Sequence, residues 1–211
     1  MKRVAVITGT TSGIGEAIAK YYIYHDYSVF AINRNDCDLK DPNNISLMVE
    51  ILKKTYQRID VLVNNAGMMF LDDFKIEMYD TVSVNMLSPI LLCQELLLNN
   101  ILTHGQIINI ASVAGITGDI DAPIYSSCKA AIINLTRSLA KSYAPNIRVN
   151  CISPGFFNTN LVPEDTPQEL IDQVPLKREA EPNEIIPVID MLHRCTYITG
   201  ANIVIDGGLS L

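Results

Sequence analysis

The feature that most constrains the fold is an alternation of short β-branched runs with longer helical patterns along the whole chain. Six runs are rich in Val and Ile and are apolar on both faces: Arg3–Ile7, Ser28–Ile32, Asp60–Val63, Gln106–Ile110, Ile147–Ile152 and Ala201–Ile205. Strands that are apolar on both faces are typical of a parallel sheet that is covered by helices on both sides.

Helical patterns lie between these runs, over Ile14–Tyr24, Ile45–Tyr56, Tyr79–Asn99, Tyr125–Tyr143 and Asn183–Leu192. The alternation predicts an α/β fold, a doubly wound Rossmann-type domain with a mostly parallel sheet. A length of 211 residues suits one domain over 1–211, since no linker or repeat divides the chain. Only a few residues separate the second run from Cys37–Leu39, so we expect the crossover helix after the second strand to be missing.

Composition narrows the partners of the chain. A net charge of -7 argues against nucleic acid and anionic membranes. Polar residues interrupt apolar stretches such as Met86–Leu98 before they reach a membrane-spanning length, and the apolar run Val4–Ile7 is too short for a signal peptide. Five cysteines without C-x-x-C spacing indicate reduced thiols in a cytoplasmic protein, and we expect no metal site.

A glycine-rich turn, Thr8–Gly15, follows the first predicted strand directly. Gly9 would permit a tight exit from the strand, Gly13 a close approach to a pyrophosphate, and Gly15 the packing of the next helix on the sheet. That helix would direct free N–H groups and its positive dipole end at the anion. An ordinary strand–helix turn is the alternative, whereas the lack of a Lys-Ser/Thr pair excludes a nucleotide-triphosphatase P-loop.

Tyr125 and Lys129 stand at i and i+4 at the start of a predicted helix, so their side chains share a face. A nearby ammonium lowers the pKa of a phenol from about 10 by favouring the phenolate. Such a phenol suits proton transfer to or from an alcohol oxygen. By spacing alone, a surface Tyr/Lys pair is the alternative.

Polar clusters also follow two predicted strands, at Asn64–Gly67 and Ala111–Gly115, and Asn85 lies inside the next helix. Asparagine forms helix poorly, so Asn85 is either functional or a solvated or locally bonded side chain. Because the carboxyl ends of parallel strands share one edge of a sheet, the clusters indicate a single crevice.

Taken in order, these motifs resemble the short-chain dehydrogenase/reductase family along essentially the whole chain. They are T-G-x-x-x-G-I-G at Thr8–Gly15, N-N-A-G at Asn64–Gly67, a Ser thirteen residues before the Tyr of Y-x-x-x-K, P-G-x-x-x-T at Pro154–Thr159 and D-G-G at Asp206–Gly208. The resemblance implies an oxidoreductase that transfers a hydride between NADP(H) and a small-molecule carbonyl or alcohol substrate.

The resemblance also implies a catalytic tetrad of Asn85, Ser112, Tyr125 and Lys129. In this tetrad, Tyr125 is the general acid/base, and Lys129 lowers its pKa and binds the nicotinamide ribose. Ser112 would hydrogen-bond the substrate oxygen, and Asn85 would hold the helix and the water of a proton relay.

The implied cofactor contacts run from the glycine turn to the end of the fifth strand. They are Gly9, Thr11, Ser12, Gly13, Ile14, Gly15, Asn33, Arg34, Asp38, Leu39, Asn65, Ala66, Gly67, Tyr125, Lys129, Pro154, Gly155, Phe157 and Thr159. Residues 65–67 would line the adenine-side ribose, and Asp38 with Leu39 would contact the adenine ring. Thr159 and the backbone of Phe157 would hold the carboxamide.

The end of the second strand bears on the choice of cofactor. An NAD site places an acidic side chain there for the ribose 2′-hydroxyl, but the position falls at uncharged Asn33. The next residue, Arg34, can pair with a 2′-phosphate, and Thr11 and Ser12 can add hydrogen bonds. Two nearby aspartates oppose this interpretation, and Arg34 as a solvated loop residue is the alternative. The pattern predicts NADP rather than NAD.

The chain departs from the family where the crossover helix is missing. We therefore expect an open adenine pocket with Cys37–Leu39 as a vestigial edge strand. The segment Asn160–Pro175 would be a short substrate-covering loop. Cys128 stands where the family commonly has Ser, and we interpret it as buried and inert.

Two other functions compete with this reading. A nicotinamide-dinucleotide-sensing protein without catalysis tends to lose the Tyr or the Lys, and both are present. A 3-oxoacyl-carrier-protein reductase needs basic residues at its entrance, yet no Lys or Arg lies between Lys75 and Lys129. The loops expected there are acidic instead, at Asp119, Asp121, Glu164, Asp165, Glu169 and Asp172, with Lys177 and Arg178 as a limited basic patch. We expect a free small molecule.

The helices Tyr79–Asn99 and Tyr125–Tyr143 are apolar around much of their circumference. One sheet contact does not readily absorb all their leucines, so the pattern favours a homodimer or homotetramer built on helix pairing. The alternative is that every leucine faces the chain's own sheet.

Overall fold

Six strands form one sheet in the computed structural model, which describes residues 2–71, 74, 78–161 and 168–211. The strands are β1 (Val4–Thr8), β2 (Ser28–Ile32), β3 (Val61–Asn64), β4 (Gly105–Ile110), β5 (Ile147–Pro154) and β6 (Asn202–Ile205). Their order is β2-β1-β3-β4-β5-β6, and every pairing is parallel. The predicted Rossmann-type α/β fold is confirmed, with a wholly parallel sheet in the described residues where we predicted a mostly parallel one.

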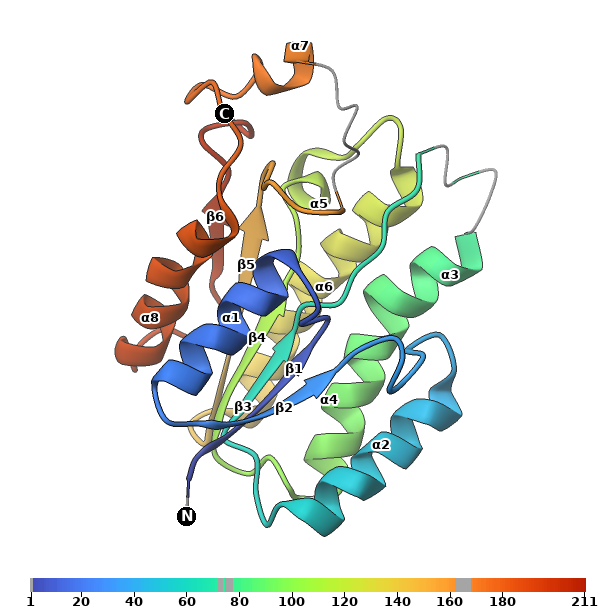
Figure 1. The fold of residues 1–211 in the computed structure, drawn as a ribbon, viewed down its shortest axis with the longest axis vertical. Coiled ribbons are helices and arrows are strands. Elements are labelled where there is room, and N and C mark those ends of the chain that lie inside the picture. The colour runs from blue at the N-terminus through green and yellow to red at the C-terminus, as the bar shows by residue number, and fades with distance from the viewer. Residues whose placement is uncertain (1, 72–73, 75–77, 162–167) are drawn as a thin grey trace.

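Helices cover both faces of this sheet (Figure 1). In chain order the helical segments are α1 (Gly13–Tyr24), α2 (Pro42–Thr55), α3 (Met78–Val82), the π-helical turn η1 (Ser83–Leu87), α4 (Ser88–Leu98), α5 (Ala114–Thr117), α6 (Pro123–Tyr143), α7 (Gln168–Ile171), the 3-10 turn η2 (Pro182–Ile185) and α8 (Ile186–Arg194). The core under α2, α4 and α6 takes Val4 and Val6 of β1, and the core under α1 and α8 takes Ala5 and Ile7. Alternate residues of one strand thus supply opposite faces.

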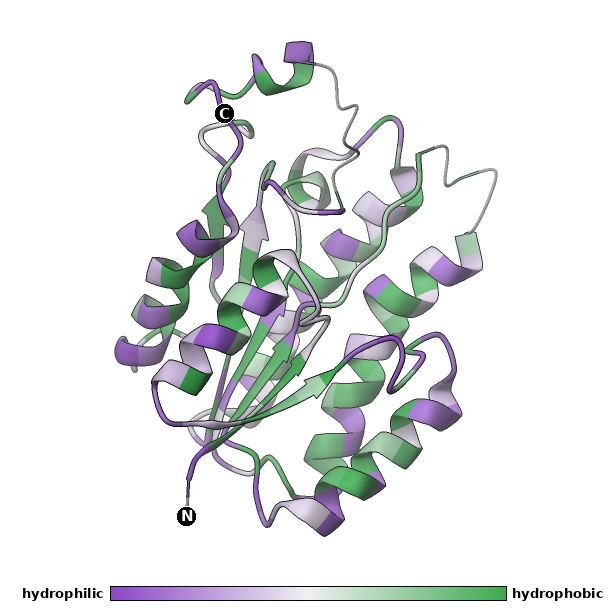
Figure 2. Cartoon of the chain, in the orientation of Figure 1, coloured by the Kyte–Doolittle hydropathy of each residue, from purple (hydrophilic) through white to green (hydrophobic). Residues whose placement is uncertain are grey.

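The polarity of the helices follows from this layering. In Figure 2 apolar residues gather on the strands and on the helix faces turned toward them, and polar residues face outward. Helices α3, η1 and α4 continue as one stretch, Met78–Leu98, that is long and apolar enough to cross a membrane by length and composition alone. The expectation that polar residues keep this stretch below a spanning length is therefore wrong by that criterion. Leu92, Cys93 and Leu96 of this stretch are buried in the sheet core. Packing therefore accounts for the apolar inner face of the helix.

The coil between β2 and α2, residues 33–41, bears on two expectations. No helix separates β2 from Cys37–Leu39, as predicted, but Cys37–Leu39 form no strand, and β2 is the sheet edge. The prediction that no crossover helix follows the second strand is therefore wrong, because α2 carries the chain from β2 past β1 to β3. The backbone turns because the N–H groups of Asp36 and Cys37 both donate to the carbonyl of Asn33 at 2.9 Å. Cys37 and Leu39 are buried in the core, so this segment, which the family resemblance implied to be a vestigial edge strand, is held by packing rather than by strand pairing.

Candidate active site

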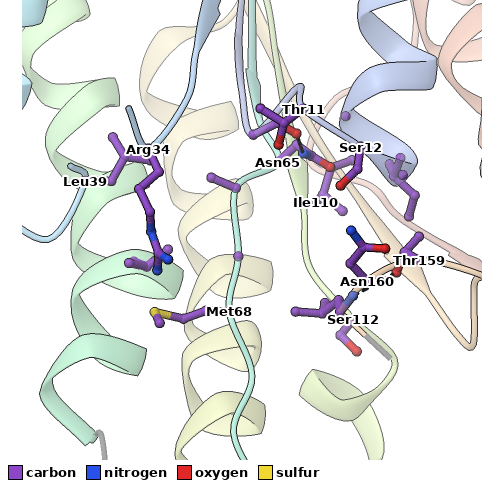
Figure 3. Close-up of a pocket in the computed structure, with 18 of the residues that line it drawn as sticks. Thr11, Ser12, Arg34, Leu39, Asn65, Met68, Ile110, Ser112, Thr159 and Asn160 are labelled. Carbon is purple, nitrogen blue, oxygen red and sulfur yellow. Dashed lines mark hydrogen bonds between the residues drawn. The ribbon is translucent and has the colours of Figure 1, made fainter. Parts of the chain in front are cut away.

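A cavity of about 490 Å³ lies where the carboxyl ends of β1 to β5 meet, and Figure 3 shows part of its lining. Every residue that we predicted to contact the cofactor lines it, and so does Ser112. Residues that the sequence did not single out as cofactor contacts also line it: Ile32, Cys37, Met68, Val84, Ile110, Ala111, Asn160 and Leu161. Asn85 is the one member of the predicted tetrad that does not line the cavity.

The glycine turn forms the wall of the cavity at the start of α1. Gly13 has a φ of +59°, and a Cβ there would lie 2.9 Å from Cγ2 of Thr159. Glycine therefore lets this turn approach the segment after β5 closely. A Cβ at Gly15 would collide with the carbonyl of Gly9 and with Nδ2 of Asn65, so glycine lets the start of α1 pack closely on the segments that follow β1 and β3.

Asn65 holds the glycine turn in place. Its Nδ2 donates to the carbonyls of Thr8 and Gly9, both at 2.9 Å. In return, Oγ1 of Thr8 accepts from the backbone N–H groups of Asn65 at 3.0 Å and Ala66 at 2.8 Å. The Asn65 side chain is thus committed to fixing two loops against each other, a role that the sequence did not reveal.

The end of β2 is tied to the same turn. Oδ1 of Asn33 accepts from the backbone N–H of Thr10 at 2.8 Å and from its hydroxyl at 3.0 Å. These bonds occupy the acceptor of the amide and leave its nitrogen, a donor, as the group for another partner. Arg34 is exposed and lies on the same side of the cavity as Leu39, opposite Thr159 (Figure 3).

Asn85 lies in the π-helical turn and is only 1% exposed. Its Nδ2 donates to the carbonyls of Met68 at 2.7 Å and Thr81 at 2.9 Å, and its Oδ1 accepts from the N–H of Met68 at 3.2 Å. Asn85 therefore clamps the segment after β3 to the helix. A Cβ at Gly67 would lie 3.1 Å from Oδ1 of Asn85 and 3.5 Å from Nζ of Lys129, so only a glycine separates these two side chains.

Tyr125 and Lys129 come from the first turns of α6, which begins at Pro123. Lys129 is 3% exposed. Its Nζ donates to the carbonyl of Ile110 at 3.0 Å and lies 5.4 Å from the centroid of the Tyr125 ring. Burial lowers the pKa of Lys129 to about 8, because the charged ammonium loses water.

The pKa of Tyr125 corrects a further expectation. Burial raises it to about 12, and the contribution that lowers it is a hydrogen bond with Ser112 rather than the charge of Lys129. Desolvation of the phenolate therefore outweighs the effect of the ammonium that we predicted. The phenol consequently carries its proton at neutral pH, and it shares a hydrogen bond with the Ser112 hydroxyl.

Comparison with known proteins places this geometry in a family. Residues 31–210 match a family profile described as enoyl-(acyl carrier protein) reductase. Carbonyl reductase family member 4 of Xenopus laevis is 33% identical, over 100% of this chain and 99% of that protein. The 3-oxoacyl-[acyl-carrier-protein] reductase FabG of Thermotoga maritima is 34% identical, over 98% and 97%. The solved structure of a 4-hydroxyisoleucine dehydrogenase complexed with NADH has a TM-score of 0.89 and 29% identity, covering 99% of both chains.

The chain belongs to the short-chain dehydrogenase/reductase family. It is therefore an oxidoreductase of the type whose members use a nicotinamide cofactor. Within this short-chain oxidoreductase, the T-G-x-x-x-G-I-G, N-N-A-G and Y-x-x-x-K motifs, the Ser and the P-G-x-x-x-T segment all contribute to one cavity.

The predicted substrate-covering loop, residues 160–175, is described in part. The predicted substrate-covering loop includes residues 162–167, which lie outside the described residues, as do Glu164 and Asp165. Leu161 lines the cavity just before them.

Cys128 is buried, as predicted. Among the described residues, no group of three or more His, Cys, Asp or Glu is arranged to hold a metal ion.

Proposed function

We propose that this short-chain oxidoreductase transfers a hydride between NADP(H) and a small carbonyl or alcohol substrate, with Tyr125 as general acid/base. The observation that carries the proposal is the pair of hydrogen-bonded hydroxyls of Tyr125 and Ser112, with the ammonium of Lys129 buried close behind the phenol. Both hydroxyl-bearing residues line a cavity that the glycine turn also borders.

The glycine turn fits a dinucleotide. Gly13 has no side chain to fill the space beside Thr159 at the N-terminus of α1, where an anionic pyrophosphate would be stabilised by N–H groups and the helix dipole. When bound, the nicotinamide ring supplies or accepts the hydride. Thr159 and the Phe157 backbone would hold its carboxamide, and Lys129 its ribose.

The side chains provide the proton. In the reductive direction, Tyr125 donates its proton to the carbonyl oxygen of the substrate, and Ser112 donates a hydrogen bond to the same oxygen. The hydrogen bond from Ser112, which lowers the pKa of Tyr125, stabilises the phenolate that remains, and Lys129 is fixed beside the ring by the carbonyl of Ile110. Asn85 keeps the Met68 backbone in position, so that the wall beside Lys129 does not move.

Two residues at the end of β2 support NADP over NAD. Asn33 carries no charge, and its remaining amide nitrogen is a donor, which suits phosphate oxygens. Arg34 offers a planar guanidinium on the same side of the cavity. An acidic residue at Asn33 would instead favour the 2′-hydroxyl of NAD.

The experiment that tests the proposal is a turnover assay with NADPH and NADH against a panel of aldehydes and ketones. We expect oxidation of NADPH with at least one carbonyl substrate. Tight binding of NADPH or NADH without turnover of any substrate would favour the sensing protein instead. Binding of neither cofactor would refute both functions.

A carrier-linked substrate is the second candidate, because relatives such as the Thermotoga maritima reductase act on acyl-carrier-protein substrates by name. The described entrance argues against it. Asp121, Glu169 and Asp172 are exposed there. Arg178 is held in an ion pair with Glu184 at 2.7 Å, and Lys177 donates to the Asp172 carbonyl at 2.5 Å. Both residues of the predicted basic patch are thus engaged by the chain itself, which disfavours the docking of an acidic carrier there.

The test compares a 3-oxoacyl carrier protein with a short free thioester of the same acyl group. We expect kcat/KM for the free thioester to equal or exceed that for the carrier. A carrier-linked substrate that is turned over far more efficiently would establish the reductase alternative.

The proposed protein is a cytoplasmic homodimer or homotetramer. Leu87 and Leu98, on the outer side of the η1–α4 stretch, are 40% and 68% exposed, which supports a homodimer or homotetramer built on this helix. All five cysteines are free thiols, in keeping with a cytoplasmic protein. Light scattering after size-exclusion chromatography would test the assembly, and a monomer at micromolar concentration would contradict it.

A further inference from the structure

We propose that the ion pair between Lys40 and Asp80 is a positioning element of the cofactor site. It fixes the coil of residues 33–41 to helix α3, so that the adenine end of the cavity keeps its shape although no strand covers it. This inference rests on the proposed function, since it assumes that the cavity binds a dinucleotide.

The coil matters because it forms one whole side of the cavity. Asn33, Arg34, Cys37, Asp38 and Leu39 all line the cavity from this coil. The coil has neither helix nor strand to stiffen it, because β2 is the edge of the sheet. Its geometry therefore depends on individual contacts.

Contacts hold the coil at its start and in its middle. Its start is fixed by Asn33, which accepts two hydrogen bonds from Thr10. Its middle is fixed by burial of Cys37 and Leu39 in the core. In the turn into α2, Asp38 accepts only from nearby residues of the chain: its Oδ1 from the N–H of Lys40 at 3.1 Å, and its carbonyl from the N–H of Asp41 at 3.1 Å and Nδ2 of Asn44 at 3.4 Å. A displacement of Lys40 would therefore move cavity-lining Asp38.

The ion pair anchors this last part of the coil. Nζ of Lys40 lies 2.9 Å from Oδ2 of Asp80, and the two side chains are 34% and 33% exposed. The groups are forty residues apart in the sequence, so the bond joins two separate parts of the fold. Exposure at this level limits its contribution to global stability, as is usual for surface pairs.

The partner helix is itself fixed to the catalytic end of the cavity. Asp80 precedes Thr81, whose carbonyl accepts from the amide of Asn85. Asn85 in turn clamps the backbone of Met68, a residue of the cavity wall. The ion pair therefore fixes the adenine side of the cavity relative to the same helical stretch that positions the wall beside Lys129.

The test uses the adenine half of the cofactor, ADP-ribose with and without a 2′-phosphate, and isothermal titration calorimetry on the whole chain. The variants are Asp80→Asn, Lys40→Met and their double mutant. Glu50→Gln is the matched control, because Glu50 forms a similar pair with Lys53 at 2.8 Å on α2, away from the cavity. Asp80→Glu, which keeps the charge, should retain the wild-type affinity.

We expect Asp80→Asn to weaken both ligands by roughly fivefold, as when the binding-competent coil is populated about one-fifth of the time. Lys40→Met should weaken them to a similar degree, and the double mutant should be no worse than either single variant. The melting temperature should change by no more than about 2 °C, and Glu50→Gln should bind like the wild type. In turnover, KM for the cofactor should rise while kcat stays constant.

The sign of the Asp80→Asn effect separates positioning from simple electrostatics. If Lys40 acted only as a charge near the phosphate, removal of the Asp80 carboxylate would leave binding unchanged or make it tighter, and either result would overturn the proposal. If Asp80→Asn unfolds the chain by disturbing the start of α3, Lys40→Met decides, and wild-type affinity in that variant would overturn the proposal. A wild-type chain that binds neither ligand would refute the proposed function, and this inference with it.

Discussion

Buried and half-buried polar side chains lie at both the amino ends and the carboxyl ends of the strands, but their hydrogen-bond partners differ. At the amino end of the strands, Arg148 donates to the carbonyls of Ile198 at 3.0 Å and Leu192 at 2.8 Å and to Oε1 of Gln106 at 3.0 Å. Gln106 also contacts Nδ1 of His193 at 3.2 Å. There, polar groups fill the space by bonding to one another.

At the carboxyl end, the polar groups border open space. Tyr125, Ser112 and Lys129 form hydrogen bonds within the protein and also line a cavity of about 490 Å³. The comparison teaches that buried polarity by itself does not mark a site. The end whose polar groups line a cavity serves a ligand, and the end whose groups satisfy one another stabilises the fold.

The largest effect that we expect is a loss of turnover when a residue at the carboxyl ends of the strands is changed. Tyr125→Phe keeps the ring but removes the hydroxyl that donates the proton. Turnover of a verified substrate should fall by about 10²–10⁴-fold, as is typical when a general acid is lost. Cofactor affinity, measured by titration, should change little. Near-native turnover by this variant would show that Tyr125 is not the acid.

The second prediction concerns the amino ends of the strands, where a substitution should lower the free energy of unfolding without changing turnover. Arg148→Met removes charged hydrogen bonds to the carbonyls of Leu192 and Ile198, which should cost about 2–3 kcal/mol in denaturant unfolding. The rate per folded molecule should not change. Lys20→Met, on the exposed surface of α1, is the control and should stay within about 0.5 kcal/mol of the wild type. A loss of kcat in Arg148→Met would break the division between the two ends.

The third effect sharpens the assignment within the carboxyl end. Arg34→Ala removes the guanidinium proposed to pair with the 2′-phosphate, so NADP(H) binding should weaken by about tenfold or more. NAD(H) binding should be spared, because it lacks that phosphate. The measurement is the pair of dissociation constants for wild type and variant. Tighter NAD(H) binding by the wild type would contradict the cofactor assignment.

The smallest effect concerns pH at the amino end. Burial lowers the pKa of His193, with further lowering from Arg3 and Arg148 and opposition from Asp190, while its Nε2 lies 3.4 Å from the Tyr27 hydroxyl. The folded pKa therefore lies below the unfolded value of about 6.5. As pH falls below that value, the unfolded state binds the proton more readily, and stability declines until the pH is below the folded pKa.

His193→Gln should flatten this decline, because glutamine does not titrate. The measurement is the denaturant midpoint between pH 8 and pH 4.5 for both proteins. Equal slopes below about pH 6.5 would mean that His193 does not contribute to the pH dependence of stability.

The sequence predicted the lining of the cavity well because its motifs are local. Gly13, Asn65, Ser112 and Thr159 each follow a strand within a few residues, and a parallel sheet brings such positions together whatever the details of packing. Asn85 was the one sequence signal at the π-helical turn. Asparagine forms helix poorly, so its place inside a predicted helix suggested a bonded side chain.

What the sequence did not reveal depends on contacts between distant segments. Cys37–Leu39 was expected to form a vestigial edge strand because of the family resemblance, but in this chain the segment is a coil fixed by burial of Cys37 and Leu39. The pKa of Tyr125 was predicted in the wrong direction because the depth of its burial is a property of the folded chain. Lys40 and Asp80 show no relation until the coil and α3 are brought side by side.

The position of β2 at the sheet edge has a consequence for hydrogen exchange. The N–H of Ser28 donates to the carbonyl of Arg3 in the neighbouring chain segment, and in a strand successive N–H groups point to alternate sides. The amides of Val29 and Ala31 therefore point away from β1, where no strand among the described residues pairs with them. In deuterated water these two amides should exchange early and those of β3 and β4 late. Protection along β2 therefore rests on the Phe30 and Ile32 amides, which face β1, and their exchange rates should report how firmly the start of the coil of residues 33–41 is held.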